Sequence, residues 1–147
     1  MAVAQVPFHD QPFEPHSELT QAHRMTAKLC GLLRQYLSEP TGYDNVEVDK
    51  QAIHLGAALL RVAWAERECG SCLGQNHFFT ASYSTMLEEH RLAFMAFEQL
   101  SGKLESATAP PAAELAGLVG AIGRHLELAE QAHQSSITAP AAAYKSA

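Results

Sequence analysis

Apolar side chains recur every three or four residues in four separate stretches of this chain, which is the period of one face of an α-helix. The first stretch follows Ser17 and Glu18 and stops before Pro40 and Gly42. Because proline and glycine interrupt helices, we expect the first helix to end just before this pair. Its predicted inward face consists of Leu19, His23, Thr26, Cys30, Leu33 and Leu37.

The second predicted helix runs from about Asn45 to Cys69. Gly70 and Gly74 end it, so residues 70–81 are expected to form a connecting loop. The helical period assigns its inward face to Ile53, Ala57, Leu60, Trp64 and Glu68.

The third predicted helix begins at Ser82 or at Thr85, where Thr85 and Glu88 match a capping box. Its expected inward face consists of Met86, His90, Phe94, Phe97 and Leu104. A proline-bearing turn follows, and Pro111 suits the first turn of a fourth helix. The inward face of that helix is expected to carry Leu115, Leu118, Ile122, His125 and Ala129.

Four amphipathic helices with short connections predict an all-α, antiparallel up-down four-helix bundle over residues 17–134. Residues 1–16 hold three prolines and no helical period, so they predict an extended N-terminal arm packed through Phe8 and Phe13. Residues 135–147 are small, polar and rich in alanine, and we expect a disordered tail there. At 147 residues, the chain is expected to form one domain.

The composition narrows the class of function. A formal net charge of -6 and the absence of a Lys/Arg cluster argue against binding to nucleic acid. No apolar run is long enough to cross a bilayer, and the N-terminus lacks the basic and apolar regions of a secretory signal, so we expect a cytoplasmic protein. Three cysteines, an odd number, argue against a disulfide framework.

Histidines lie on the predicted inward faces of three helices, at positions 23, 90 and 125, and Glu68 lies on that of the fourth. In an up-down bundle all four positions belong to the same end, within roughly 12 Å of one another along the axis. A single histidine on an apolar face is more often a hydrogen-bonded core residue than a ligand. Three together with a buried carboxylate favour a metal site, because a cation stabilises a buried charge.

The same segments resemble hemerythrin-like domains. LTQAHRMTAKLCGLLRQYL is similar to the first helix of that family, and LVGAIGRHLELAEQ is similar to its last helix, in which a histidine and an acidic residue five positions later bind iron. WAERE aligns with the family's His-x-x-x-Glu pair, and MLEEH aligns with its His-x-x-x-His pair. Trp64 and Met86 replace two of the family's ligands. The resemblance therefore implies five retained ligands, which are His23, Glu68, His90, His125 and Glu130.

The family site is a di-iron centre that binds dioxygen, and two missing ligands leave three outcomes open. The chain could hold a weaker or mononuclear metal, it could recruit His77 or His133 as a further ligand, or it could be a metal-free relic whose polar groups satisfy one another. Cys69 and Cys72 form a CxxC pair that suits zinc or thiol redox chemistry, although two incidental cysteines are the simpler interpretation.

The sequence therefore predicts a non-catalytic, hemerythrin-like metal-binding protein. Iron is the expected cofactor and zinc is the alternative, and dioxygen, nitric oxide or iron itself is the expected ligand. A weak oxidase or peroxidase activity is compatible with this hypothesis but is not predicted. The second hypothesis is a metal-free helical module that binds or regulates a protein partner, and a zinc-binding sensor domain is the third. Trp64 and Met86 favour the metal-free module, because neither replaces the lost imidazole.

Overall fold

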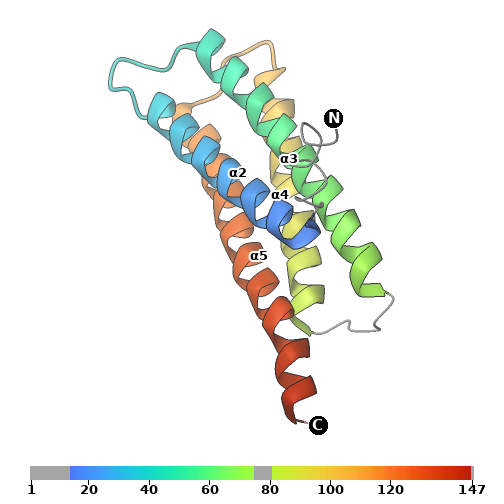
Figure 1. Ribbon diagram of the computed structural model, residues 1–147. Coiled ribbons are helices and arrows are strands. Elements are labelled where there is room, and N and C mark those ends of the chain that lie inside the picture. The colour runs from blue at the N-terminus through green and yellow to red at the C-terminus, as the bar shows by residue number, and fades with distance from the viewer. Residues whose placement is uncertain (1–13, 75–80, 147) are drawn as a thin grey trace, which may run out of the picture.

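The computed structural model describes residues 14–74 and 81–146 of the chain. Four α-helices form it, and the described residues contain no β-strand. Successive helices run in opposite directions along a common axis (Figure 1). The predicted all-α four-helix bundle is therefore confirmed. Its helices are α2 (Pro15–Leu37), α3 (Asn45–Gly74), α4 (Ala81–Leu104) and α5 (Ala112–Ser146).

The four helices do not pack evenly around the axis. Helix α2 packs against α3 and α5, and α5 packs against α4. Helices α3 and α4 make few contacts with each other, so one side of the bundle is open. Phe97 of α4 lies on α3 at Gly56, where an added Cβ would come within 2.8 Å of the aromatic ring.

Local signals set the turns at the end of the bundle where α3 begins. Gly42 adopts a φ of 106°, a left-handed conformation that glycine adopts without a steric penalty. The Asp44 carboxylate accepts a hydrogen bond of 2.9 Å from the Val46 backbone N–H and thereby caps α3. The Tyr43 hydroxyl donates to the Pro110 carbonyl at 2.5 Å, which joins the two loops at this end.

The core confirms the predicted inward face of α2, since all six of its residues are buried. In α4 and α5 the predicted faces are correct only in part. The predicted residues Met86, His90, Leu115, Ile122 and Ala129 are buried. The other predicted residues are only partly buried at the edge of the core, and these are Phe94, Phe97, Leu104, Leu118 and His125. The buried centre of these two helices consists of Met86, His90, Ala93, Ala96, Leu100, Leu115, Val119, Ile122, Leu126 and Ala129.

The predicted inward face of α3 is wrong. Ile53 is 72% exposed, Leu60 is 73% exposed and Trp64 is 46% exposed. Helix α3 is apolar on more than one face between residues 52 and 65, so the period alone did not determine which face is buried. The buried face consists of Val48, Ala52, Leu55, Ala58, Leu59, Val62, Ala65 and Cys69.

The helices are longer than the sequence predicted. Helix α2 begins at Pro15, and α3 continues to Gly74 instead of ending near Cys69. Helix α5 continues to Ser146, although a disordered tail was predicted from residue 135. Alanine favours helix, and Ser136 is buried at the site described below, so helix is favoured beyond Gln134. The predicted contacts of Phe8 and Phe13 lie outside the described residues.

Within the described part of the chain, none of the helices combines the length and apolar composition that crossing a bilayer requires.

Candidate metal centre

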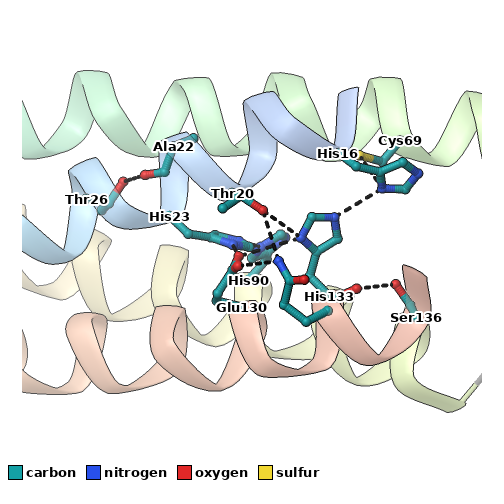
Figure 2. A network of polar contacts seen from close by, with 11 residues as sticks. His16, Thr20, Ala22, His23, Thr26, Cys69, His90, Glu130, His133 and Ser136 are labelled. Atoms are coloured by element: carbon teal, nitrogen blue, oxygen red, sulfur yellow. Dashed lines mark hydrogen bonds and ion pairs between the residues drawn. The ribbon is translucent and has the colours of Figure 1, made fainter. Parts of the chain in front are cut away.

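Polar side chains occupy the core in the half of the bundle where α2 and α4 begin. His23 on α2, His90 on α4 and His133 on α5 are each at most 2% exposed. Figure 2 shows them close together between the helices, with Glu130 beside His23 and His133. Histidine is seldom buried without hydrogen-bonding partners, so the contacts of these rings decide what the cluster can do.

His23 and His90 form the centre of a linear array. His23 Nδ1 lies 2.5 Å from Glu130 Oε1, and His90 Nδ1 lies 2.6 Å from Glu66 Oε1. The two Nε2 atoms lie 2.7 Å from each other. The order is therefore carboxylate, imidazole, imidazole, carboxylate, with each residue contributed by a different helix.

A count of protons shows why this array is unusual. An ionised carboxylate only accepts hydrogen bonds, so each Nδ1 must carry the proton that it donates to its carboxylate. In two neutral rings, both Nε2 atoms would then be acceptors and their lone pairs would face each other. A hydrogen bond at 2.7 Å between them requires one additional proton, which would make the pair of rings a cation.

Burial opposes that additional proton. Removal from water lowers the pKa of His23 from 6.5 to about 4, and the nearby His90 acts in the same direction, while the hydrogen bond with Glu130 only partly compensates. Burial would raise the pKa of Glu130, but hydrogen bonds from His23 and Gln134 outweigh it and the pKa is lowered. At neutral pH, the array therefore holds ionised Glu130 next to a neutral His23 ring.

A second group of ligand atoms lies next to this array. His16 Nδ1 lies 3.1 Å from His133 Nε2 and 3.6 Å from Cys69 Sγ. On its other side, His133 Nδ1 lies 3.5 Å from Thr20 Oγ1 and 3.6 Å from Glu130 Oε1. In Figure 2, the His133 ring lies between Glu130 on one side and His16 and Cys69 on the other.

Among the described residues, two groups bring three different ligand atoms within 4.8 Å of one another. One consists of His23, Glu130 and His133, and the other consists of His16, Cys69 and His133. The structure thus brings together three of the five predicted ligands, His23, His90 and Glu130, in one buried cluster.

Glu68 is not part of this cluster, and its assignment is corrected. The prediction depended on the face of α3 that carries Leu60 and Trp64, which the structure places on the outside. Glu68 is only half-buried, and none of the described contacts joins it to His23, His90 or Glu130. Glu66 on α3 is the carboxylate that reaches His90.

His125 is also placed apart from the cluster. It lies five residues before Glu130, about 140° around an ideal helix, and here its ring is directed to α4 instead of to the cluster. Its Nδ1 lies 2.6 Å from Glu89 Oε1 on α4, at the edge of the core. His133 follows Glu130 by three residues, about 60° around the helix, and therefore shares its face.

His16 and Glu66 were not predicted as site residues, and His133 was predicted only as a substitute ligand. His16 lay in the segment predicted as an extended arm, before the expected start of the helix. His133 could have been found from the buried face of α5, because it continues the spacing of Ile122, Leu126 and Ala129. His77 and the side chain of Cys72 lie outside the described residues.

The donor chemistry fits a first-row transition metal. Histidine ligands commonly donate their second ring N–H to a carboxylate, which orients the ring, and His23 and His90 each have this arrangement. Two nitrogen ligands on one ion lie about 2.9 to 3.4 Å apart at metal–nitrogen bonds of about 2.0 to 2.1 Å. The two Nε2 atoms would therefore need to separate by about 0.2 to 0.7 Å, and the two rings would turn so that both lone pairs point at the ion. Comparison with protein-family models, with curated proteins and with solved structures gave no match to this chain.

Proposed function

We propose that this protein binds a transition metal ion, iron in the first instance, between His23 and His90 in the core of the bundle. The observation that carries the proposal is the pair of facing Nε2 atoms, 2.7 Å apart, with each Nδ1 held by a carboxylate. A cation between the rings would satisfy both lone pairs without the additional proton that burial disfavours.

The neighbouring groups would complete the ligand set. Glu130 lies against His23 and supplies negative charge next to a cation, and Glu66 does the same next to His90. Imidazole and carboxylate ligands suit Fe(II) and also Zn(II). Iron is preferred because the helices resemble those of hemerythrin-like domains.

An Fe(II) ion with so few protein ligands would keep open positions, which is the requirement for binding dioxygen or nitric oxide. The protein residues would orient the ion, and the apolar core around Met86 and Leu126 would limit the access of water. We therefore propose a non-catalytic role in binding or sensing a small gas or iron itself. The resemblance to hemerythrin-like domains supports the same role.

The test is a metal titration of the untagged protein under anaerobic conditions. Wild-type protein is expected to bind one equivalent of Fe(II) in this site, measured by elemental analysis after gel filtration. A new visible absorption is expected when nitric oxide is added. His23→Ala and His90→Ala should each lower the affinity by at least about 100-fold, because loss of an outer carboxylate alone costs roughly 10- to 100-fold.

His54→Ala is the matched control, because His54 is an exposed histidine on α3 outside the cluster. It should bind iron as the wild type does. The proposal would be contradicted if His54→Ala lost iron binding as strongly as the His23 and His90 variants do. It would also be contradicted if those two variants bound iron as tightly as the wild type. Binding of zinc but not of iron would retain the metal site and remove the gas-binding role.

A second candidate function, an interaction module, is favoured by the open side of the bundle. A groove of about 600 Å³ runs between α3 and α4, and its walls include Phe94 and Phe97. Ile53 and Leu60 line the same groove from α3 and are largely exposed. The same open face of a second copy would cover these exposed apolar side chains about a twofold axis, so a second copy of this chain is the occupant we infer.

Solution mass measurement tests this candidate over a range of concentrations. The wild type is expected to form a dimer that Leu60→Glu converts to a monomer, because a charge would be buried in the interface. Gln35→Glu, at an exposed position on α2 outside the groove, adds the same single negative charge and is the control. A wild-type protein that remains monomeric at high concentration would exclude this candidate.

A further inference from the structure

The three ligand atoms of His16, Cys69 and His133 lie outside the His23–His90 pair and have a different chemistry. They combine two imidazoles with one thiol, whereas the pair is surrounded by carboxylates. Cys69 is fully buried, and His133 is 1% exposed. His16 belongs to the first turn of α2, Cys69 to the last turns of α3, and His133 to α5. Three helices thus bring three distant parts of the sequence to one point.

The spacing of these atoms matches tetrahedral zinc. Zn–N bonds of about 2.05 Å and Zn–S bonds of about 2.3 Å place two nitrogen ligands about 3.3 Å apart and a nitrogen and a sulfur about 3.6 Å apart. His16 Nδ1 lies 3.1 Å from His133 Nε2 and 3.6 Å from Cys69 Sγ. The third edge, between Cys69 and His133, is within 4.8 Å. Two of the three edges therefore lie close to the lengths that tetrahedral zinc requires, and the third would close by at most about 1.2 Å when an ion enters.

The surroundings of His133 suit this role. Its Nδ1 lies near the hydroxyl of Thr20 and the carboxylate of Glu130, at 3.5 and 3.6 Å. An acceptor on that side favours the tautomer in which Nδ1 carries the proton and Nε2 is the acceptor that faces His16 and Cys69. Glu130 thus lies beside His23 on one side and His133 on the other, between the two candidate sites.

We propose that His16, Cys69 and His133 form a second metal site that takes Zn(II), with the fourth position open to solvent or another ligand. A thiolate with two imidazoles is a donor set that zinc uses in proteins. Binding converts the Cys69 thiol to a thiolate and releases its proton to solvent, with no change of oxidation state. The site stands on its own three ligands and does not depend on iron binding between His23 and His90.

Cobalt(II) is the probe for this site, because a thiolate ligand gives Co(II) a charge-transfer band in the near ultraviolet and imidazoles alone do not. When Co(II) is added to metal-free full-length protein, this band should appear, together with strong visible bands from tetrahedral Co(II). Addition of Zn(II) should abolish both. Cys69→Ser should lose the thiolate band, and His16→Gln should lose the tetrahedral visible bands.

Zinc affinity, measured by competition with a coloured chelator, gives the second readout. His16→Gln and Cys69→Ser should each weaken zinc binding by at least about 100-fold, more than the 10- to 100-fold cost of losing an outer-sphere partner. His16→Gln changes a half-exposed residue in the first turn of a helix, so the fold should persist even if Cys69→Ser destabilises the core. Cys30→Ser is the matched control for a buried thiol, and it should retain both the band and the affinity.

His23→Ala separates the two proposals. It should remove the iron site and leave the cobalt thiolate band and the zinc affinity within a few-fold of wild type. A thiolate band that survives Cys69→Ser and disappears in Cys72→Ser would overturn the assignment of Cys69. The absence of a thiolate band in the wild type would overturn the second site, whatever the result for iron.

Discussion

The two halves of this bundle have cores of opposite chemistry. Where α2 and α4 end, the buried side chains of the described residues are apolar, and Leu33, Leu100 and Leu115 are completely buried. Where α2 and α4 begin, histidines occupy the same interior positions, and carboxylates from α3 and α5 hold two of them. The same helices thus combine a half that stabilises the fold with a half whose polar groups must satisfy one another.

The histidine half is costly unless every buried polar group has a hydrogen-bond partner. In the described residues, no buried side-chain nitrogen or oxygen lacks a hydrogen-bond partner. For His23 and His90, the contact between the two Nε2 atoms is favourable only with one extra proton between them, or with a cation in its place. The apolar half has no such dependence, because burial of hydrocarbon stabilises it at any pH.

The largest effect is expected in the apolar half. Leu33→Ala should lower the free energy of unfolding by about 2 to 5 kcal/mol, because it leaves a cavity in a closely packed core. Denaturant titration measures this cost. The stoichiometry of metal binding should not change, because Leu33 lies well away from the histidines along α2. A cost below 1 kcal/mol would show that this half does not carry the stability of the fold.

A smaller effect is expected from pH in the histidine half of metal-free protein. His23 has a pKa of about 4 when folded and an ordinary value of 6.5 when unfolded, so the unfolded chain binds more protons between these values. The free energy of unfolding is therefore highest above pH 7. It falls by roughly 3 kcal/mol as the pH is lowered from 6.5 to 4. Denaturant titrations at several pH values in the presence of a chelator measure it.

Two variants serve as controls for this pH dependence of the free energy of unfolding. Leu33→Ala should retain the same pH dependence, because it changes only the apolar half. His54→Ala should retain it as well. A free energy of unfolding that stays constant or rises between pH 6.5 and pH 4.5 would contradict the burial of a neutral His23.

The smallest effect is expected on the outer face of α3. Leu60 is 73% exposed, so Leu60→Ser should change the free energy of unfolding by less than about 0.5 kcal/mol in monomeric protein. Its neighbour Leu59 is 4% exposed, and Leu59→Ser should cost more than about 2 kcal/mol because it puts a hydroxyl in an apolar core. Equal costs at the two positions would mean that α3 is rotated from the orientation described here.

The sequence by itself determined the number of helices, their order and the buried face of α2. Helical period and the Pro and Gly signals at residues 40 and 42 are local properties, and they do not require knowledge of the neighbours. It also determined that His23 and His90 belong to the same half of the bundle, because the lengths of antiparallel helices fix which positions share an end. Glu130 was predicted only through the resemblance to hemerythrin-like domains.

Only the tertiary structure decided how each helix is rotated about its own axis. Helix α3 carries apolar residues on several faces, so its packing against α2 selected Leu59 for the inside and left Leu60 outside. The same rotation brought Glu66, and not Glu68, to His90. A rotation of one or two residues moves a side chain by 100° to 200°, which separates a ligand from a surface residue. Convergence of His16, Cys69 and His133 was decided in the same way, by packing between helices that are distant in sequence.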